Sequence, residues 1–208
     1  MPRSICHALI QLGVNEVHYM AGISVMASIA ERGILSFNAL ERAGIVSPSL
    51  ANPDIQARRG NTRIVGIELH EFVPLYFATH TPMQYEIEHR NGFDSDDLFM
   101  LDVSVKQIGD LARLVYFTDR NAACSNVEFR DKPEHLATID WPIVQNVRRC
   151  LSPDYKARKA AELLVYPKVE TQCIARIVTR SEGARQQILR FLKKPHTPVE
   201  IDRSRYFK

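Results

Sequence analysis

The sequence has no long hydrophobic run and no recognisable export signal. None of its 208 residues lie in a segment that approaches the roughly 20 apolar residues needed to cross a bilayer. The first residues, MPRSICHALIQLGV, include a short apolar stretch but not the charged start, long apolar run and cleavage site of a secretory signal. We therefore expect a cytoplasmic protein with no membrane partner.

Cysteine is scarce, and its spacing excludes two kinds of stabilising site. Cys6, Cys124, Cys150 and Cys173 lie far apart and form no Cys-x-x-Cys pair, so neither a zinc knuckle nor a disulfide framework is indicated. Ligand-spaced clusters of His, Cys and carboxylates are also missing, as are Gly-rich phosphate loops and internal repeats. We expect reduced, mostly packed thiols and no metal.

The composition is that of a globular protein with an uneven distribution of charge. With 45% apolar residues, the chain can bury a full core, and we expect residues 1–208 to form one domain. Residues 148–208 contain 15 Lys and Arg against 6 Asp and Glu, a charge of +9, whereas residues 1–147 contain 12 against 18, or −6. The basic region suggests a polyanionic partner, although solvated helix faces give the same pattern.

Hydrophobic periodicity predicts strands and helices without regular alternation, which favours an α+β fold over a doubly wound sheet. The predicted strands are 16–20, 73–79, 98–103, 114–119, 162–166, 173–179 and a segment near 198–202. The predicted helices are 22–33, 37–44, 81–88, 133–141, 143–150, 152–161 and 182–194. Residues 46–63 read as a surface loop with a helical turn.

Four polar features lie at the ends of these elements: His18, the pair Arg58 and Arg59, the segment 70–85, and Glu162. Glu162 stands where the basic stretch KARKAA meets the apolar run LLVY. An unpaired carboxylate is costly in a buried strand, so Glu162 either faces water at a strand edge or supplies charge to a cleft. Each of the other features also has a purely structural interpretation.

Taken together, these features resemble the DarT-like single-stranded DNA ADP-ribosyltransferases, the toxins of bacterial toxin–antitoxin pairs. The resemblance covers about residues 16–180, in order and with similar gaps. It rests on His18 followed by ISVMASIAERGILS, then DIQARR (54–59), HEFVPLYF (70–77), TPMQY (81–85), FTDRNA (117–122), IDWPIV (139–144) and KAAELLV (159–165). Departures include Glu71 and Phe72 for an Asp-Tyr pair, Leu75 for Phe, and Met20 for a frequent Thr.

This resemblance implies an ADP-ribosyltransferase (PARP-like) fold, with mixed central sheets flanked by helices, and NAD as the co-substrate. By the same resemblance, Glu162 and Arg59 are catalytic, and His18, Met20, Arg59 and Tyr76 bind NAD. A carboxylate near the ribose can offset the positive charge that develops when the bond to nicotinamide breaks. We expect the basic residues just before Glu162 to keep it ionised or to guide the DNA; they are Lys156, Arg158 and Lys159.

The resemblance also implies a surface for single-stranded DNA, formed by Met83, Tyr85, Arg120 and Asn121. The family contains members that modify thymidine and members that modify guanosine. Because the amides of Gln84 and Asn121 can each donate and accept, they suit the mixed edge of guanine, and the sequence leans toward guanosine.

Other functions remain open at this stage. Transfer of ADP-ribose to RNA or protein, an RNA phosphotransferase of similar fold, and a catalytically silent nucleic-acid-binding module are the alternatives. For the leading interpretation, the expected partner is a macrodomain-type or other ADP-ribosyl-hydrolase antitoxin.

Overall fold

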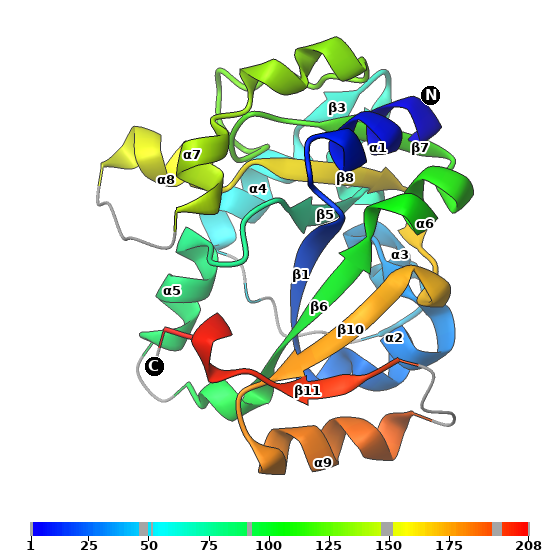
Figure 1. The fold of residues 1–208 in the computed structure, drawn as a ribbon, viewed down its shortest axis with the longest axis vertical. Helices are drawn as coiled ribbons and strands as arrows, with labels where there is room; N and C mark the ends of the chain where they lie inside the picture. The colour runs from blue at the N-terminus through cyan, green and yellow to red at the C-terminus, as the bar shows by residue number, and fades with distance from the viewer. Residues whose placement is uncertain are drawn as a thin grey trace.

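The structure is a computed structural model that describes residues 2–45, 50, 52–90, 93–146, 152–192 and 197–207. Its main feature is a seven-stranded sheet in the order β11-β10-β6-β1-β5-β8-β7, shown in Figure 1. All neighbouring strands pair antiparallel except β10 and β11, which are parallel. The strands are β1 (Glu16–Gly22), β5 (Val73–Tyr76), β6 (Leu98–Ser104), β7 (Leu114–Phe117), β8 (Glu162–Tyr166), β10 (Ile174–Thr179) and β11 (Val199–Ile201).

The sheet consists of two halves that meet at β1 and β5. β1 pairs with β6 along its whole length, from Glu16 to Gly22, but with β5 only where His18 faces Tyr76. Figure 1 accordingly shows β5 and β8 crossing the upper part of the molecule while β1, β6 and β10 run steeply through the lower part. The divergence of β1 from β5 leaves room between the two halves for a cleft.

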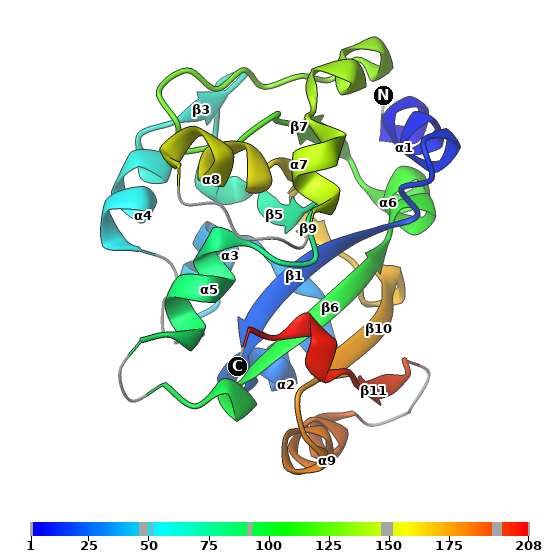
Figure 2. The same ribbon diagram turned by 60° about the vertical axis from the view of Figure 1, so that its left-hand side comes forward.

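Helices surround this sheet, as the turned view in Figure 2 shows. They are α1 (Pro2–Gln11), α2 (Met26–Arg32), α3 (Phe37–Arg42), α4 (Pro53–Gly60), α5 (Pro82–Glu88), α6 (Val105–Leu111), α7 (Trp141–Gln145), α8 (Pro153–Lys159) and α9 (Glu182–Phe191). Several begin with the capping residues that the sequence offers: Asn52, Thr81 and Ser152 each accept a hydrogen bond from the first turn and precede a proline. No helix among the described residues is long and apolar enough to span a membrane.

Shorter elements complete the chain. Two small ladders pair β2 (Ile34–Leu35) with β9 (Lys168–Val169), and β3 (Arg63–Ile64) with β4 (Ile67–Glu68). The 3-10 turns are η1 (Ile23–Val25), η2 (Leu69–Glu71), η3 (Ser95–Asp97), η4 (Pro133–Thr138), η5 (Thr171–Cys173) and η6 (Arg203–Arg205).

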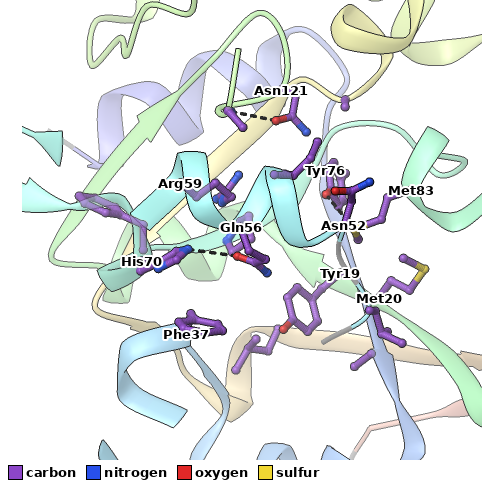
Figure 3. Close-up of a pocket in the computed structure, with 18 of the residues that line it drawn as sticks. Tyr19, Met20, Phe37, Asn52, Gln56, Arg59, His70, Tyr76, Met83 and Asn121 are labelled. Atoms are coloured by element: carbon purple, nitrogen blue, oxygen red, sulfur yellow. Dashed lines mark hydrogen bonds between the residues drawn. The ribbon is translucent and has the colours of Figure 1, made fainter. Parts of the chain in front are cut away.

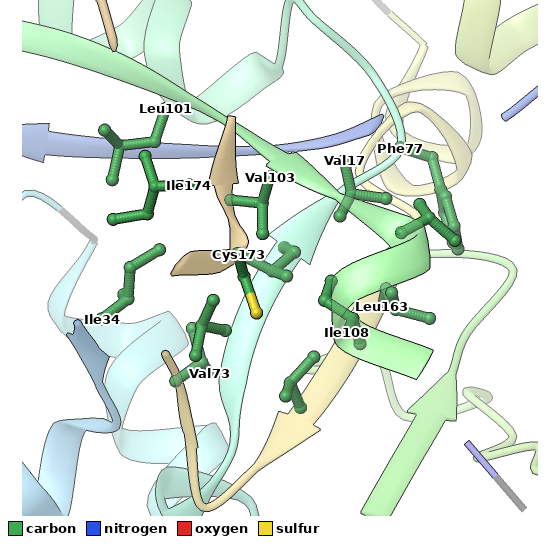
Figure 4. Packing of buried hydrophobic residues seen from close by; sticks show 14 of the residues in the cluster. Val17, Ile34, Val73, Phe77, Leu101, Val103, Ile108, Leu163, Cys173 and Ile174 are labelled. Atoms are coloured by element: carbon green, nitrogen blue, oxygen red, sulfur yellow. The ribbon is translucent and has the colours of Figure 1, made fainter. Parts of the chain in front are cut away.

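The main hydrophobic core joins one face of the sheet to α1, α2 and α6. Figure 4 shows part of it, where Val17 and Val103 from the sheet pack with Ile108 of α6 and with Cys173. Cys6 lies in the same core, and burial raises its pKa to about 12, so this thiol stays protonated at neutral pH. Cys150 lies outside the described residues.

The elements missed from the sequence are those that packing stabilises against propensity. α6 was not predicted, because Gly109 interrupts its pattern; a Cβ on this glycine would lie 2.9 Å from Cβ of Cys6, so α1 and α6 approach closely only with glycine here. α1 was not predicted either. The expected helix over 133–141 is a 3-10 turn followed by α7, and the part of the expected 143–150 helix beyond Asn146 lies outside the described residues.

Candidate active site

Glu162 is the first residue of β8 and is completely buried. Nη1 of Arg59 lies 3.1 Å from its Oε1 and 2.9 Å from its Oε2, and the backbone N–H of Ala122 donates to Oε1 at 3.1 Å. The backbone of Glu162 is held as well, because its carbonyl accepts from Thr118 N at 2.9 Å. Glu162 is therefore a paired, rigidly held charge inside the protein and not a strand-edge residue.

The two adjacent arginines of α4 have different environments. Arg59 is buried, whereas Arg58 is exposed and donates from Nε to the carbonyl of Asp54 at 3.3 Å. Both lie in the last turn of α4, where a cation interacts favourably with the helix dipole. The helical turn expected within residues 46–63 is the two-turn helix α4, which delivers Arg59 to Glu162, whereas residues 46–49 and 51 lie outside the described residues.

A row of polar side chains crosses the sheet at one level. Glu162 on β8 faces Tyr76 on β5, Tyr76 faces His18 on β1, His18 faces Asp102 on β6, and Asp102 faces Arg176 on β10. Directly facing residues of neighbouring strands project to the same side of a sheet. Three residues of the resemblance, Glu162, Tyr76 and His18, are therefore neighbours, and Asp102 and Arg176 extend their row.

Asp102 forms the centre of the second half of this row. It is completely buried, and His18, Arg176 and Arg205 all contact its carboxylate. Burial alone would raise the pKa of Asp102, but hydrogen bonds from His18 and Arg205 and the charge of Arg205 outweigh it, so the pKa lies well below its ordinary value. Asp102 carries no functional signal in the sequence, since it lies within the strand-like run LFMLDV.

A cavity of about 730 Å³ opens between the two halves of the sheet (Figure 3). This volume is within the range of small-molecule and cofactor sites. Five predicted residues line it: Met20, Arg59, Tyr76, Met83 and Asn121. Glu162 and His18 adjoin it through their partners Arg59 and Tyr76, while Tyr85 and Arg120 are not part of the described lining.

A second group of lining residues, Phe37, Gln56 and His70, was given no individual role from the sequence. The rings of Phe37 and His70 lie 4.5 Å apart, and Nε2 of His70 is 3.1 Å from Oε1 of Gln56. Burial, followed by the charge of Arg59, lowers the pKa of His70, so its ring is neutral at neutral pH. This part of the cavity combines flat aromatic surfaces with an amide.

Helix α5 forms one wall of the cavity with Met83, whose Sδ is 3.8 Å from the hydroxyl of Tyr76. Gln84 does not reach the cavity. It is buried and donates from Nε2 to Oε1 of Glu88 at 2.7 Å and to the carbonyl of Arg205 at 2.6 Å. Gln84 is therefore not the base-reading residue that the sequence suggested. Tyr85 stacks on the ring of His89 at 3.9 Å.

The turn 118–124 presents Asn121 to the cavity. Oδ1 of Asn121 accepts from Ala123 N at 2.8 Å, so its orientation is fixed by its own turn. Arg120 is only slightly exposed and pairs with Asp119 at 3.1 Å. The charge of Arg120 is therefore partly neutralised within the protein.

The basic C-terminal part differs from expectation. Lys159 does not face Glu162; it is buried and donates to the carbonyls of Val144 at 2.6 Å and Asn146 at 2.5 Å. Further basic residues pair with carboxylates: Arg158, Lys168, Arg176, Arg185 and Arg205. Arg148, Arg149, Lys193, Lys194 and Lys208 lie outside the described residues. Of the basic residues expected to assist Glu162, Lys156 lines the cavity and is exposed.

The described part of the chain contains no group of three or more His, Cys, Asp or Glu side chains arranged to hold a metal ion. The charged side chains that line or adjoin the cavity include Arg58, Arg59, Lys156, Glu41, Glu86 and Glu162.

Comparisons with known proteins identify the family of this chain. The family model described as "ssDNA thymidine ADP-ribosyltransferase, DarT" matches residues 18–207. A DNA ADP-ribosyl transferase of Thermus sp. (strain 2.9) is 30% identical over 154 residues, which cover 70% of this chain and 73% of the relative. A fusion of a DNA ADP-ribosyl transferase with a DNA ADP-ribosyl glycohydrolase from Thermosipho africanus is 27% identical over 93% of this chain and half of its own length.

Solved structures are also similar. DarT of Thermus sp. 2.9 in complex with ADP-ribosylated single-stranded DNA has a TM-score of 0.82 at 25% identity, over 94% of this chain and 97% of its own. A structure of the same protein with NAD+ has a TM-score of 0.74 at 23% identity, over 93% and 98%. The predicted α+β ADP-ribosyltransferase fold is confirmed. The chain belongs to the DarT family of single-stranded DNA ADP-ribosyltransferases, enzymes that use NAD as co-substrate.

Proposed function

We propose that this chain, acting as one domain over residues 1–208, transfers ADP-ribose from NAD to a thymidine base of single-stranded DNA and releases nicotinamide. The observation that carries this proposal is the buried Arg59–Glu162 pair at the wall of the cavity. A fixed carboxylate beside a cationic group suits a reaction in which positive charge develops on a ribose bound next to a pyrophosphate.

In this reaction the bond between the nicotinamide nitrogen and C1′ of the ribose breaks, and the electron pair leaves with neutral nicotinamide. Glu162 orients the ribose hydroxyls and offsets the oxocarbenium-like charge. The guanidinium of Arg59 has several N–H donors, so it can turn from Glu162 toward the pyrophosphate or the acceptor base. A nitrogen of the base then attacks C1′ and loses its proton.

The remaining predicted residues divide by their places in the cavity. His18, Met20 and Tyr76 line or adjoin the end where β1 and β5 separate, and we assign them to NAD together with Arg59. Met83 and Asn121 line the wall formed by α5 and the turn 118–124, and we assign them to the DNA. Tyr85 and Arg120, on the same two segments, would contact the strand on either side of the modified base.

We propose thymidine as the modified base in place of guanosine, which the sequence favoured. That lean depended on the amides of Gln84 and Asn121, and the amide of Gln84 is bonded to Glu88 and Arg205 inside the protein. The family model is described for thymidine. Thymine presents an imide N–H between two carbonyl oxygens, for which an amide such as that of Asn121 is a suitable partner.

Oligonucleotides that each lack one base test this proposal directly. Incubated with the protein and NAD, single strands with thymine should gain one ADP-ribose by mass and release one nicotinamide. Strands without thymine should stay unmodified. An adduct that persists without thymine and vanishes without guanine would show that guanosine is the acceptor. Modification of RNA or protein alone, or no nicotinamide release with any acceptor, would favour the alternative functions.

We also propose that the protein is the toxin of a pair whose antitoxin is an ADP-ribosyl hydrolase of the macrodomain type. A relative that carries a DNA ADP-ribosyl glycohydrolase in the same chain supports this, because fusion places the forward and reverse activities together. Expression should arrest growth of a bacterial host, and co-expression of a DNA ADP-ribosyl glycohydrolase should relieve the arrest. Equal growth with and without induction of the active protein would contradict the toxin role.

A further inference from the structure

The buried carboxylate of Asp102 connects His18 to the C-terminal segment of the chain. Its Oδ1 lies 2.7 Å from Nδ1 of His18 and 2.9 Å from Nη2 of Arg205. Its Oδ2 accepts from Nε of Arg176 at 2.8 Å and from Nη1 of Arg205 at 3.1 Å. Two guanidinium groups thus hold one carboxylate, and the carboxylate holds the imidazole.

These contacts determine where the ring of His18 carries its proton. An ionised carboxylate has no proton to give, so a separation of 2.7 Å requires that Nδ1 of His18 is the donor. The two flanking guanidinium groups keep Asp102 ionised, in agreement with its lowered pKa. In the neutral ring, Nε2 then has a lone pair and points away from Asp102. The other strand beside His18 is β5, where Tyr76 faces His18 and lines the cavity.

We propose that Asp102 is a positioning residue that holds His18 in the Nδ1-protonated tautomer, so that Nε2 accepts a hydrogen bond from a hydroxyl of the bound co-substrate, and that Arg205 braces this pair. The hydrogen bond to the co-substrate rests on the proposed NAD-binding role of His18. The tautomer and the brace are properties of the protein alone. A carboxylate that fixes the tautomer and orientation of a histidine is a recurrent device in enzyme sites.

Arg205 is well placed to act as the brace, because the segment around it is bonded on several sides. The Arg205 carbonyl accepts from Gln84 of α5, and the backbone N–H of Phe207 donates to Oε2 of Glu88 at 2.9 Å. The hydroxyl of Tyr206 reaches the carbonyls of two sheet strands, at Leu98 and Val178. Figures 1 and 2 show this segment between α5 and the sheet.

Nitrogen-15 NMR of the histidine rings measures the tautomer without any ligand. Spectra of the wild-type protein, assigned by comparison with His18→Ala and recorded where the ring is neutral, should show His18 with a protonated Nδ1 and a lone-pair-bearing Nε2. The opposite tautomer would overturn the proposal, whether or not His18 binds NAD. This measurement needs no folded variant of Asp102.

Asp102→Asn should reverse the tautomer. Arg176 and Arg205 together direct three N–H donors at the position of Oδ2 of Asp102. The amide oxygen of the asparagine should therefore occupy this position. Its NH2 group then replaces Oδ1 and faces Nδ1 of His18. Nδ1 would then have to accept, and Nε2 would carry the proton. We expect the KM for NAD to rise roughly tenfold, with a smaller change in kcat. The variant alters the hydrogen bond that His18 offers to NAD and leaves the proposed catalytic residues unchanged.

The two arginines of η6, Arg203 and Arg205, provide a matched pair of variants. Arg205→Gln removes the guanidinium beside Oδ1 and His18, and should raise the KM for NAD severalfold. Arg203→Gln changes an exposed arginine of the same turn, and should leave the KM within about twofold. Equal effects of both changes on KM would overturn the bracing role of Arg205. If His18→Ala leaves NAD binding unchanged while the NMR result holds, the proposed role of His18 fails and the tautomer assignment stands.

Discussion

Arg59 and Glu162 are 103 positions apart in the sequence, yet one nitrogen of Arg59 lies within hydrogen-bond distance of both carboxylate oxygens of Glu162. Both side chains are buried, so each charge depends on the other for compensation. The two proposed catalytic groups therefore stabilise each other. A ligand that draws Arg59 away must replace that stabilisation.

Glu162→Gln tests the role of the carboxylate. Transfer to single-stranded DNA should fall at least about 100-fold, because the charge that offsets the developing cation is lost. The free energy of unfolding should fall by about 3 kcal/mol, since Arg59 remains buried without a counter-ion. Nicotinamide release and urea unfolding measure the two effects. The control is Glu170→Gln, which removes an exposed partner of Lys168 and should cost about 1 kcal/mol at most.

Arg59→Ala and Arg58→Ala separate the two arginines of α4. Arg59→Ala should abolish transfer and lower the melting temperature, because it leaves Glu162 buried with a single backbone donor, Ala122. Arg58→Ala should retain most activity, since Arg58 is exposed and its Nε donates to a carbonyl of its own helix. Activity assays with both variants decide this, and the reverse order of effects would refute the assignment.

Lys159 makes stability depend on alkaline pH. Burial lowers its pKa from 10.5 to about 8 in the folded protein, so the unfolded chain binds more protons between these values. The contribution of Lys159 to the free energy of unfolding should therefore rise as the pH increases from about 8 to about 10.5, by up to about 3 kcal/mol. The difference between wild type and Lys159→Met, measured by urea unfolding at several pH values, should follow this curve. A flat difference would contradict it.

Lys156→Ala should weaken binding of single-stranded DNA uniformly across sequences. Lys156 is an exposed cation at the cavity, and the loss of one phosphate contact should lower the slope of log affinity against log salt by about 0.7. Fluorescence anisotropy at several salt concentrations measures the slope. Arg190→Ala, which removes an exposed cation from α9, is the matched control and should leave the slope unchanged.

Gly33→Ala should destabilise the fold. Gly33 has φ +80°, and a Cβ there would lie 2.1 Å from the carbonyl oxygen of Val169, so the β2–β9 ladder would have to separate. We expect a loss of about 3 kcal/mol or more in thermal or urea unfolding. Gly44→Ala is the control, because Gly44 has φ +65° but nothing within 4 Å, and should cost about 1 kcal/mol.

The sequence predicted those parts of the site that have local signals. His18 and Glu162 stand at strand residues with clear apolar neighbours, and Arg59 belongs to a stretch that the resemblance covers. Met83 and Asn121 were also expected near one another, and both line the cavity. The roles of these residues stay predictions until the variants are measured.

The remaining features depend on partners far away in the chain. Asp102 looks like one polar residue in an apolar strand, since Arg176 and Arg205 lie 74 and 103 positions away. Gln84 looked available for a base, because nothing local indicates its bond to Arg205. The same holds for Lys159, whose acceptors lie at the end of α7. Charge counts along the sequence cannot distinguish solvated cations from those already paired.

His18 and Arg205 lie 187 positions apart in the sequence, and their side chains approach to 3.3 Å. A chain is synthesised from its N-terminus, so His18, Arg59 and Glu162 leave the ribosome before Arg205 does. Until residues 203–207 have emerged, α5 lacks its bonds to this segment, and Asp102 lacks one of its two guanidinium partners. The proposed co-substrate site is therefore complete only after the segment 203–207 has joined the fold, so its first strand and its last turn depend on each other.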